Sequence, residues 1–171
     1  MSRTLRKTMA EKQTVFGGWC ALPSAFGAEL LAAEGLDYVC VDQQHGLIDY
    51  ADITPMFMAI ERAGSIPVTR VPALNDWLIA KALDAGAQAV IVPMCETPEQ
   101  AAAAVAACRY PPTGIRSYGP IRSALVRRAR DTATLGDDPM CFVMIESRRG
   151  LANLEAIVST PGLDGIYVGP A

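Results

Sequence analysis

Short apolar runs recur along this chain, and helix-like segments separate them. We expect seven strands, at residues 15–20, 38–41, 67–72, 89–93, 116–118, 141–145 and 164–168. Continuous apolar runs bounded by turn residues are typical of strands that are buried on both faces of a parallel sheet. Because these strands alternate with helices, the pattern predicts an α/β fold built from parallel β/α units.

Capping residues and glycines mark the helices between these runs. Ser24, Asp49 and Asn75 can each accept a hydrogen bond from the first N–H groups of a helix, and residues 97–100 form a capping box. Glycines shortly after three of the segments provide stops. We expect helices at 24–34, 49–63, 75–85, 97–108, 122–130 and 151–158.

The residues that end the apolar runs are polar or shape the backbone: Asp42, Arg70, Pro93, Glu146 and the pair 169–170. No G-x-G-x-x-G opens a helix and no P-loop is present, which disfavours a nucleotide-binding open sheet. Functional groups at the carboxyl ends of strands are typical of a (β/α)8 TIM barrel. Since a barrel needs eight strands in about 250 residues, we expect a single domain, 1–171, that is truncated after the seventh strand.

Composition excludes several classes of function. The net charge of −3 does not provide the basic face of a general nucleic-acid binder. No apolar run reaches the roughly 20 residues of a membrane helix, and the basic N-terminus leads into Glu11 instead of an apolar signal core. We therefore expect a cytoplasmic protein with no nucleic-acid or membrane partner. The five cysteines form no C-x-x-C pair and are expected to be buried thiols.

One basic cluster occupies residues 122–130, around Arg127 and Arg128. We interpret it as a solvated helix face. The alternative is a contact with an anionic substrate or with another subunit.

Four groups at the strand ends could form one site: Asp42, His45, Arg70 and Glu146. A carboxylate suits Mg²⁺ or Mn²⁺, and a guanidinium can bind a carboxylate or stabilise an oxyanion. The single histidine is a candidate general base, and Asp84 is a candidate to orient its imidazole. Each residue also has a structural alternative, because Asp42 can cap a turn, Arg70 can pair with it, and Glu146 can form an ion pair at the rim.

A series of ordered motifs resembles the pyruvate-dependent, metal-dependent class II aldolases of the HpcH/HpaI family, which are related to the citrate lyase β-chain. The resemblance extends from residue 17 to the end of the chain. Its motifs are Ala28-Glu29-Leu30-Leu31-Ala32, Val41-Asp42-x-x-His45, Val68-Thr69-Arg70-Val71-Pro72, Leu83-Asp84-x-Gly86, Val92-Pro93-Met94, the segment 109–116, Ile145-Glu146 and Gly169-Pro170-Ala171.

The resemblance implies catalytic roles for four residues. His45, oriented by Asp84, would be the base and would act through a metal-bound water. Asp42 would support the metal waters and Arg70, and Arg70 would stabilise the enolate oxygen of pyruvate. The reaction implied is the cleavage or formation of a 2-keto-4-hydroxy acid, with pyruvate and an aldehyde as the small-molecule substrates.

The resemblance also implies the binding groups. Glu146 would be a ligand of Mg²⁺, Mn²⁺ or Co²⁺, and a second carboxylate ligand is expected just beyond Ala171. Backbone amides around Gly169 and Ala171 would hold the pyruvate carboxylate, while Trp19 would line the pocket. A homo-oligomer, a hexamer when full length, is the implied assembly.

The chain departs from the family pattern at three positions. Gln44 replaces an acid, Met144 replaces a glutamine found in some members, and the second metal carboxylate lies beyond the last residue. We expect little activity from these 171 residues alone. The alternatives are a lyase acting on a coenzyme A thioester, as in the citrate lyase relatives, and a non-catalytic barrel fragment.

Overall fold

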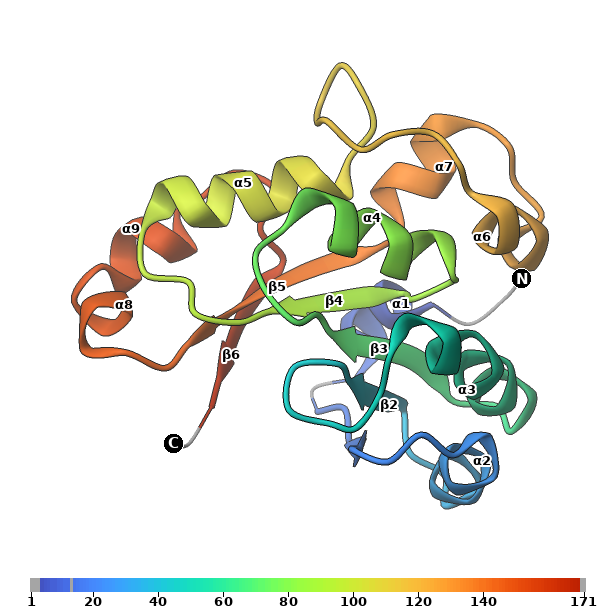
Figure 1. Ribbon diagram of the computed structural model, residues 1–171. Helices are drawn as coiled ribbons and strands as arrows, with labels where there is room; N and C mark the ends of the chain where they lie inside the picture. Colours follow the sequence, from blue (N-terminus) through green and yellow to red (C-terminus); the bar gives the residue numbers. More distant parts are fainter. Residues whose placement is uncertain (1–3, 13, 170–171) are drawn as a thin grey trace.

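The computed structural model describes residues 4–12 and 14–169. Its centre is a parallel sheet of six strands in the order β1-β2-β3-β4-β5-β6. The sheet is curved, and most of the helices cover its outer side (Figure 1). The strands are β1 (Gly17–Cys20), β2 (Tyr38–Asp42), β3 (Ile66–Arg70), β4 (Ala89–Val92), β5 (Met140–Ile145) and β6 (Gly165–Val168).

The helices that connect these strands follow the capping signals closely. Ser24, Asn75 and Thr97 accept the expected backbone hydrogen bonds, and Asp49 takes part in a capping box. The glycines at 35, 64 and 86 all have positive φ, as stops in the left-handed region require. These helices are α2 (Ala25–Ala33), α3 (Tyr50–Arg62), α4 (Asp76–Asp84) and α5 (Pro98–Cys108).

The remaining helices are shorter than the pattern predicted or were not expected. The segment 122–130 is helical only as α6 (Ile121–Arg127), and 151–158 belongs to two helices, α8 (Arg148–Ala152) and α9 (Leu154–Val158). Helices α1 (Leu5–Glu11) and α7 (Thr132–Asp137) were not predicted. Among the described helices, none is both long enough and apolar enough to cross a bilayer.

The strand predicted at 116–118 is wrong. The N–H of Ile115 donates to the carbonyl of Ala106 and the N–H of Arg116 to that of Arg109, so this segment folds back on the end of α5. Strand β4 pairs directly with β5. The described sheet therefore has six strands, two fewer than a complete eight-stranded barrel.

Alternate residues of each strand form two apolar layers. Val41, Val90 and Val143 are fully buried against the helices. On the concave side, Cys40, Val68, Ile91 and Met144 are buried together with Leu5 of α1. In parallel sheets of this kind, burial on both faces explains why the strands read as continuous apolar runs.

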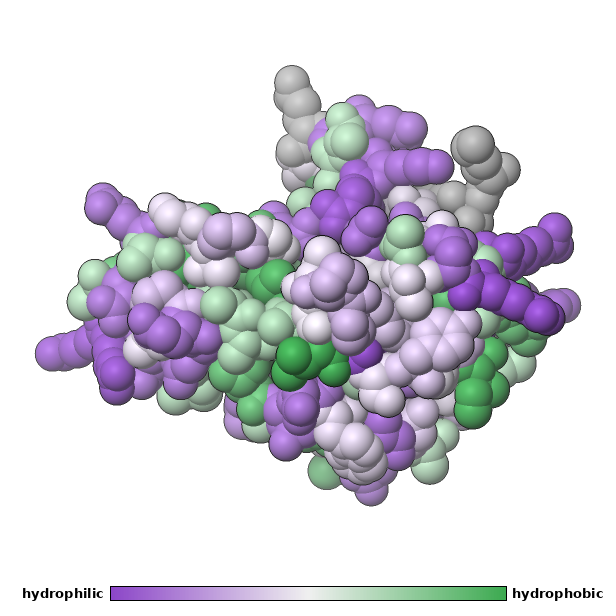
Figure 2. Space-filling view, turned by 90° about the horizontal axis from the view of Figure 1, so that it is seen from above, coloured by the Kyte–Doolittle hydropathy of each residue, from purple (hydrophilic) through white to green (hydrophobic). Residues whose placement is uncertain are grey.

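On the face seen in Figure 2, hydrophilic groups project around the rim and apolar groups gather in patches between them. The basic cluster at 122–130 is not wholly solvated, which corrects part of its interpretation. Arg122 donates to the carbonyl of Ala85 (2.8 Å) and pairs with Glu61, and Arg127 pairs with Asp138 at 3.0 Å.

Candidate active site

Residues at the carboxyl ends of the strands lie on the same concave side of the sheet as the buried apolar layer. Asp42 and Arg70 are direct neighbours in the register of β2 and β3. Because side chains alternate along a strand, both residues point to the same side as Cys40 and Val68, two positions earlier. Glu146 has the same parity as Met144 on β5. The strand ends therefore carry charged groups directly above an apolar floor.

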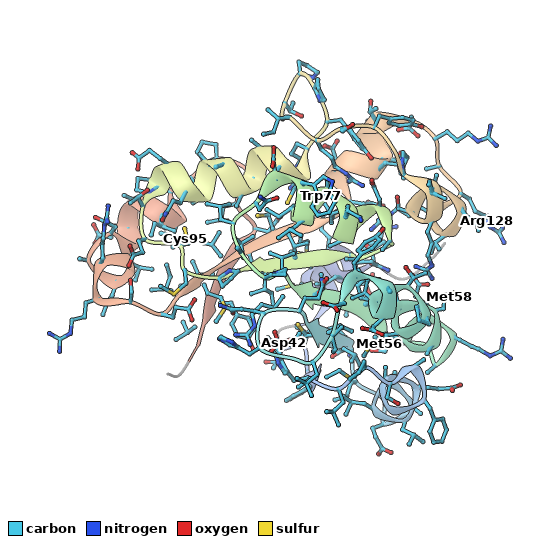
Figure 3. The ribbon with its side chains drawn as sticks, in the orientation of Figure 1. Asp42, Met56, Met58, Trp77, Cys95 and Arg128 are labelled. Carbon is cyan, nitrogen blue, oxygen red and sulfur yellow. The ribbon has the colours of Figure 1, made fainter. Side chains whose placement is uncertain are left out.

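Asp42 is the most heavily bonded carboxylate at this edge. Its Oδ1 accepts from Arg70 Nε at 2.9 Å and from the backbone N–H groups of Gln44 and His45. Its Oδ2 accepts from Arg70 Nη2 and from the indole N–H of Trp19 at 3.2 Å. Figure 3 shows Asp42 at the end of β2. This two-pronged pair fixes the plane of the guanidinium and also holds the loop that carries His45.

The charge states of this pair support each other. Burial alone would raise the pKa of Asp42, but the hydrogen bonds from Arg70, His45, Trp19 and Gln44 outweigh it, so the pKa is lowered. The hydrogen bond to Asp42 raises the pKa of Arg70, and the negative charge of nearby Glu146 adds to the rise. Arg70 therefore stays cationic and Asp42 anionic throughout the neutral range.

Two aromatic rings complete the wall beside Arg70. The guanidinium carbon lies 5.1 Å from the centroid of the Trp19 ring. Trp19 in turn contacts Tyr167 of β6, with ring centroids 5.6 Å apart. Asp42 engages Nε and Nη2 of the guanidinium, and the remaining nitrogen, Nη1, donates to the sulfur of Met144 at 3.9 Å.

Glu146 is held by a strained loop. Its Oε1 accepts the N–H of Met94 at 2.6 Å, and Met94 has φ of +56°, a left-handed conformation that a non-glycine residue rarely adopts. Gly169 approaches the other side, since a Cβ built there would lie 3.9 Å from Glu146 Oε2. Glu146 is therefore oriented by the backbone N–H that follows β4 and lies close to the backbone that follows β6.

The carboxylate of Glu146 is the type of ligand that a divalent cation prefers. Among residues 4–12 and 14–169, no three His, Cys, Asp or Glu side chains cluster closely enough to enclose a metal ion. Oε2 of Glu146 accepts no hydrogen bond from a described residue, however, and carboxylate oxygens are the ligands that hard divalent cations prefer. Glu146 is thus a group at this edge that could bind one.

His45 and Asp84 are not brought together within this chain. His45 is exposed just after β2, and its imidazole makes no hydrogen bond to any described residue. Asp84 is the last residue of α4, which runs antiparallel to the strands and so ends toward their amino ends. There its Oδ1 accepts from Arg116 at 2.6 Å. Burial outweighs this bond and raises the pKa of Asp84.

The structure therefore places Trp19, Asp42, Arg70, Glu146 and Gly169 at one edge, with His45 on the adjoining loop and Asp84 elsewhere. Ala171 and the expected second carboxylate lie outside the described residues. Sequence reasoning missed two contributors. Tyr167 lies two residues before Gly169 and shares its parity, which is a readable signal. Met94 follows the Val-Pro motif, but nothing in its residue type predicts a left-handed backbone.

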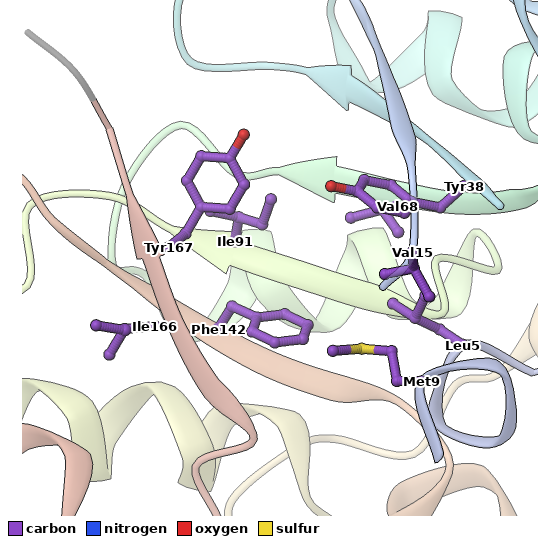
Figure 4. Close-up of a pocket in the computed structure, with 9 residues that line it drawn as sticks. All are labelled: Leu5, Met9, Val15, Tyr38, Val68, Ile91, Phe142, Ile166 and Tyr167. Carbon is purple, nitrogen blue, oxygen red and sulfur yellow. The ribbon is translucent and has the colours of Figure 1, made fainter. Parts of the chain in front are cut away.

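Below this edge the concave face is hollowed by an apolar cavity of about 180 Å³. Figure 4 shows its lining, to which the helix α1 contributes Leu5 and Met9 and the strands contribute most of the rest. Tyr167 lines this cavity and also touches Trp19, so the cavity lies directly under the site. The floor of the candidate site is therefore apolar.

Comparison with known proteins agrees with this arrangement. The profile of the HpcH/HpaI aldolase/citrate lyase family matches residues 16–171. The hydroxypyruvate/pyruvate aldolase of Roseobacter denitrificans is 37% identical over 171 residues, which cover 98% of this chain and 67% of that protein. The pyruvate aldolase of Rhizobium etli is 39% identical over 169 residues, covering 97% of this chain and 66% of that protein.

A solved structure shows the same fold. An HpcH/HpaI aldolase/citrate lyase family protein from Burkholderia cenocepacia superposes with a TM-score of 0.88 at 36% identity, covering 98% of this chain and 68% of that one. The curved parallel sheet defines a TIM-barrel-like α/β fold, and the matched family and relatives place the chain in the aldolase and lyase class. This chain belongs to the HpcH/HpaI aldolase/citrate lyase family, and it spans about two thirds of the length of these relatives.

Proposed function

We propose that this chain binds a 2-oxo acid at the edge formed by Asp42, Arg70 and Glu146. The reaction is metal-dependent aldol cleavage or formation of a 2-keto-4-hydroxy acid through the enolate of pyruvate. The observation that carries this proposal is the guanidinium of Arg70, which Asp42 clamps at 2.9 Å and whose Nη1 makes only a weak bond, to the Met144 sulfur, over an apolar floor.

Arg70 supplies positive charge where the reaction develops negative charge. Removal of a proton from the methyl group of pyruvate leaves an enolate oxygen, and a preorganised donor stabilises it without rearrangement. Asp42 holds the guanidinium in place but, with several donors directed at it, is a poor base. The low-dielectric floor strengthens the interaction between Arg70 and the enolate.

Glu146 is the proposed ligand for Mg²⁺, Mn²⁺ or Co²⁺. When bound, such a cation acts as a Lewis acid toward the keto group. The hydrogen bond from Met94 fixes one carboxylate oxygen and directs the other toward Gly169. Backbone amides at Gly169 and Ala171 are proposed to receive the carboxylate of the 2-oxo acid, and Trp19 to flank it.

His45 is the proposed base. Its loop is anchored by the bond from its own N–H to Asp42, while the imidazole remains exposed and able to accept a proton. Because Asp84 lies toward the other end of the strands, its proposed role in orienting His45 requires a second copy of the chain. A homo-oligomer is therefore part of this proposal.

Hydrogen exchange tests the proposal directly. The chain is incubated with pyruvate and Mg²⁺ in D₂O, and loss of the methyl signal is followed by proton NMR. We expect exchange that is slow, in keeping with the little activity expected of these 171 residues, but that stops when a chelator removes the cation and resumes when Mg²⁺ is restored. Exchange at the rate of a protein-free control would reject the proposal for this chain and favour a non-catalytic barrel fragment.

A further inference from the structure

Met144 touches both of the groups that would anchor a 2-oxo acid. It lies on β5 with a relative exposure of 2%, two residues before Glu146. Its sulfur is 3.9 Å from Arg70 Nη1. At its other end, a Cβ added to Gly169 would come within 2.6 Å of Met144 Cε, so the methyl group presses against the backbone there. A molecule that bridges Arg70 and Gly169 must therefore lie across this thioether.

Apart from Arg70, the side chains buried beside Met144 on the concave side are apolar. A thioether sulfur is only a weak hydrogen-bond acceptor and donates nothing. The neighbouring concave positions Val68 and Ile91 are apolar and buried. Tyr167, the register partner of Met144, carries a hydroxyl, but that hydroxyl points across the floor toward Tyr38 (Figure 4).

We infer that Met144 makes the site selective for 2-oxo acids whose C3 carries only hydrogen or alkyl groups, and that it disfavours 3-hydroxy-2-oxo acids. This inference rests on the proposed function, which directs the keto oxygen to Arg70 and the carboxylate to Gly169. Carbon C3 is bonded to the keto carbon and then lies against the thioether. Because the keto oxygen then engages Arg70, a hydroxyl on C3 would lose its water there and gain only the weakly accepting sulfur as a partner.

The expected discrimination is moderate. An apolar wall rejects a substrate that adds only a hydroxyl by a factor of up to about 100. We expect 3-hydroxypyruvate to bind at least about tenfold more weakly than pyruvate, and 2-oxobutanoate to bind within a few fold of pyruvate.

Trp19 provides the measurement, because it lies against Arg70 and the chain has only two tryptophans. Trp77 is exposed on α4, so W77F leaves Trp19 as the single fluorescent indole. In this background, with Mg²⁺ present, the fluorescence is titrated with pyruvate, 2-oxobutanoate and 3-hydroxypyruvate to obtain three dissociation constants.

Three further variants assign the selectivity to Met144. M144Q adds an amide that can pair with the hydroxyl and should bring the ratio of the hydroxypyruvate to the pyruvate dissociation constant close to one. M144L keeps the wall apolar and should keep the ratio. M58Q makes the same change at an exposed position on α3 and should have no effect.

The outcomes separate the two proposals. Equal affinities for pyruvate and 3-hydroxypyruvate in the W77F chain, or a ratio that M144Q leaves unchanged while the variant still binds pyruvate, would overturn the inference and leave the proposed function standing. If M144Q does not fold, a loss of selectivity in M144L would also overturn the inference. A Trp19 signal that responds to none of the three acids would reject the proposed function itself.

Discussion

Two aspartate–arginine pairs lie toward opposite ends of the strands and behave differently. Asp42 and Arg70 meet at the carboxyl edge of the sheet, where Asp42 also accepts bonds from Trp19 and two backbone N–H groups. Asp84 and Arg116 meet toward the amino ends, where Asp84 accepts one bond, at 2.6 Å. The pKa of Asp42 is lowered in spite of burial, because of the hydrogen bonds that it accepts. Burial raises the pKa of Asp84.

The difference shows what a buried ion pair needs in order to hold its charge. Burial penalises both carboxylates, and only a sufficient number of donors compensates for it. Arg116 has no exposed side-chain surface, stacks on Tyr110 and leaves its Nε without a partner. The Asp84–Arg116 pair therefore has a structural role, holding the segment at 116 against the end of α4. The Asp42–Arg70 pair instead keeps a fixed cation at a partly open edge, which is the arrangement that binding an anionic oxygen requires.

The largest expected effect is on catalysis at Arg70. R70K keeps the positive charge but loses the planar two-pronged contact with Asp42. Losing one preorganised donor typically reduces turnover by about 100-fold or more, so we expect methyl exchange of pyruvate to fall by about that factor. The matched control is R109K, which alters the Arg109–Asp164 pair near the start of β5. An equal loss of exchange in R109K would show that the effect is not specific to Arg70, and would contradict the special role given to the Asp42–Arg70 pair.

The next largest effect is on the free energy of unfolding, measured for substitutions of the two aspartates. D42N places a donor amide against the donors of Arg70 and Trp19, and we expect the free energy of unfolding to fall by about 3 kcal/mol. D84N retains an acceptor for its single bond at a site where burial raises the pKa of the carboxylate, so we expect a loss below about 1 kcal/mol. Urea unfolding followed by circular dichroism measures both. Equal losses would contradict the argument that donor number separates the pairs.

Much of this contrast could be predicted from the sequence, because strand direction and side-chain parity are readable. The apolar runs that end at Asp42, Arg70 and Glu146 predicted correctly that these residues share one edge. The caps at Ser24, Asn75 and Thr97 located three helix starts to within a residue.

The failures have physical causes as well. The segment 116–118 resembles a short strand, but its hydrogen bonds go to the end of α5, a tertiary choice that local pattern does not encode. The direction of α4 carries Asp84 away from the carboxyl edge of its own chain, so the role of Asp84 beside His45 stays a prediction. The contacts of Met144 and the backbone of Met94 depend on neighbours remote in sequence.

Acid should act on the two pairs in opposite directions. For Asp42, whose pKa lies below the ordinary 3.8, stability is fully present above that value and is lost as the pH falls further, through the folded-state pKa. For Asp84, whose pKa lies above 3.8, the folded state takes up a proton first, so stability increases as the pH falls from the folded-state pKa toward 3.8.

Unfolding at a series of pH values checks these signs. The stability advantage of the unmodified chain over D42N should shrink below pH 3.8, and its stability relative to D84N should improve as the pH falls toward 3.8 from above. Parallel pH dependence in the two comparisons would mean that the opposite pKa shifts are not real.

The smallest expected effect concerns backbone strain at the same two ends. Met94 beside Glu146 and Arg128 at the end of α6 both have left-handed backbones, with φ of 56° and 52°. Figure 3 shows Arg128 beside α6, well away from Asp42. Glycine adopts this conformation without steric cost, so M94G and R128G should each raise the free energy of unfolding by about 0.5–1 kcal/mol.

M94G and R128G should differ in methyl exchange although they change stability alike. M94G keeps the N–H that binds Glu146 but frees the loop, and a looser Glu146 should weaken Mg²⁺-dependent methyl exchange by several fold at low Mg²⁺. R128G, remote from this loop, should leave exchange unchanged. If M94G gains stability and exchanges as fast as the unmodified chain, the left-handed backbone at Met94 has no role in orienting Glu146. The two ends of the sheet would then differ in their ion pairs alone.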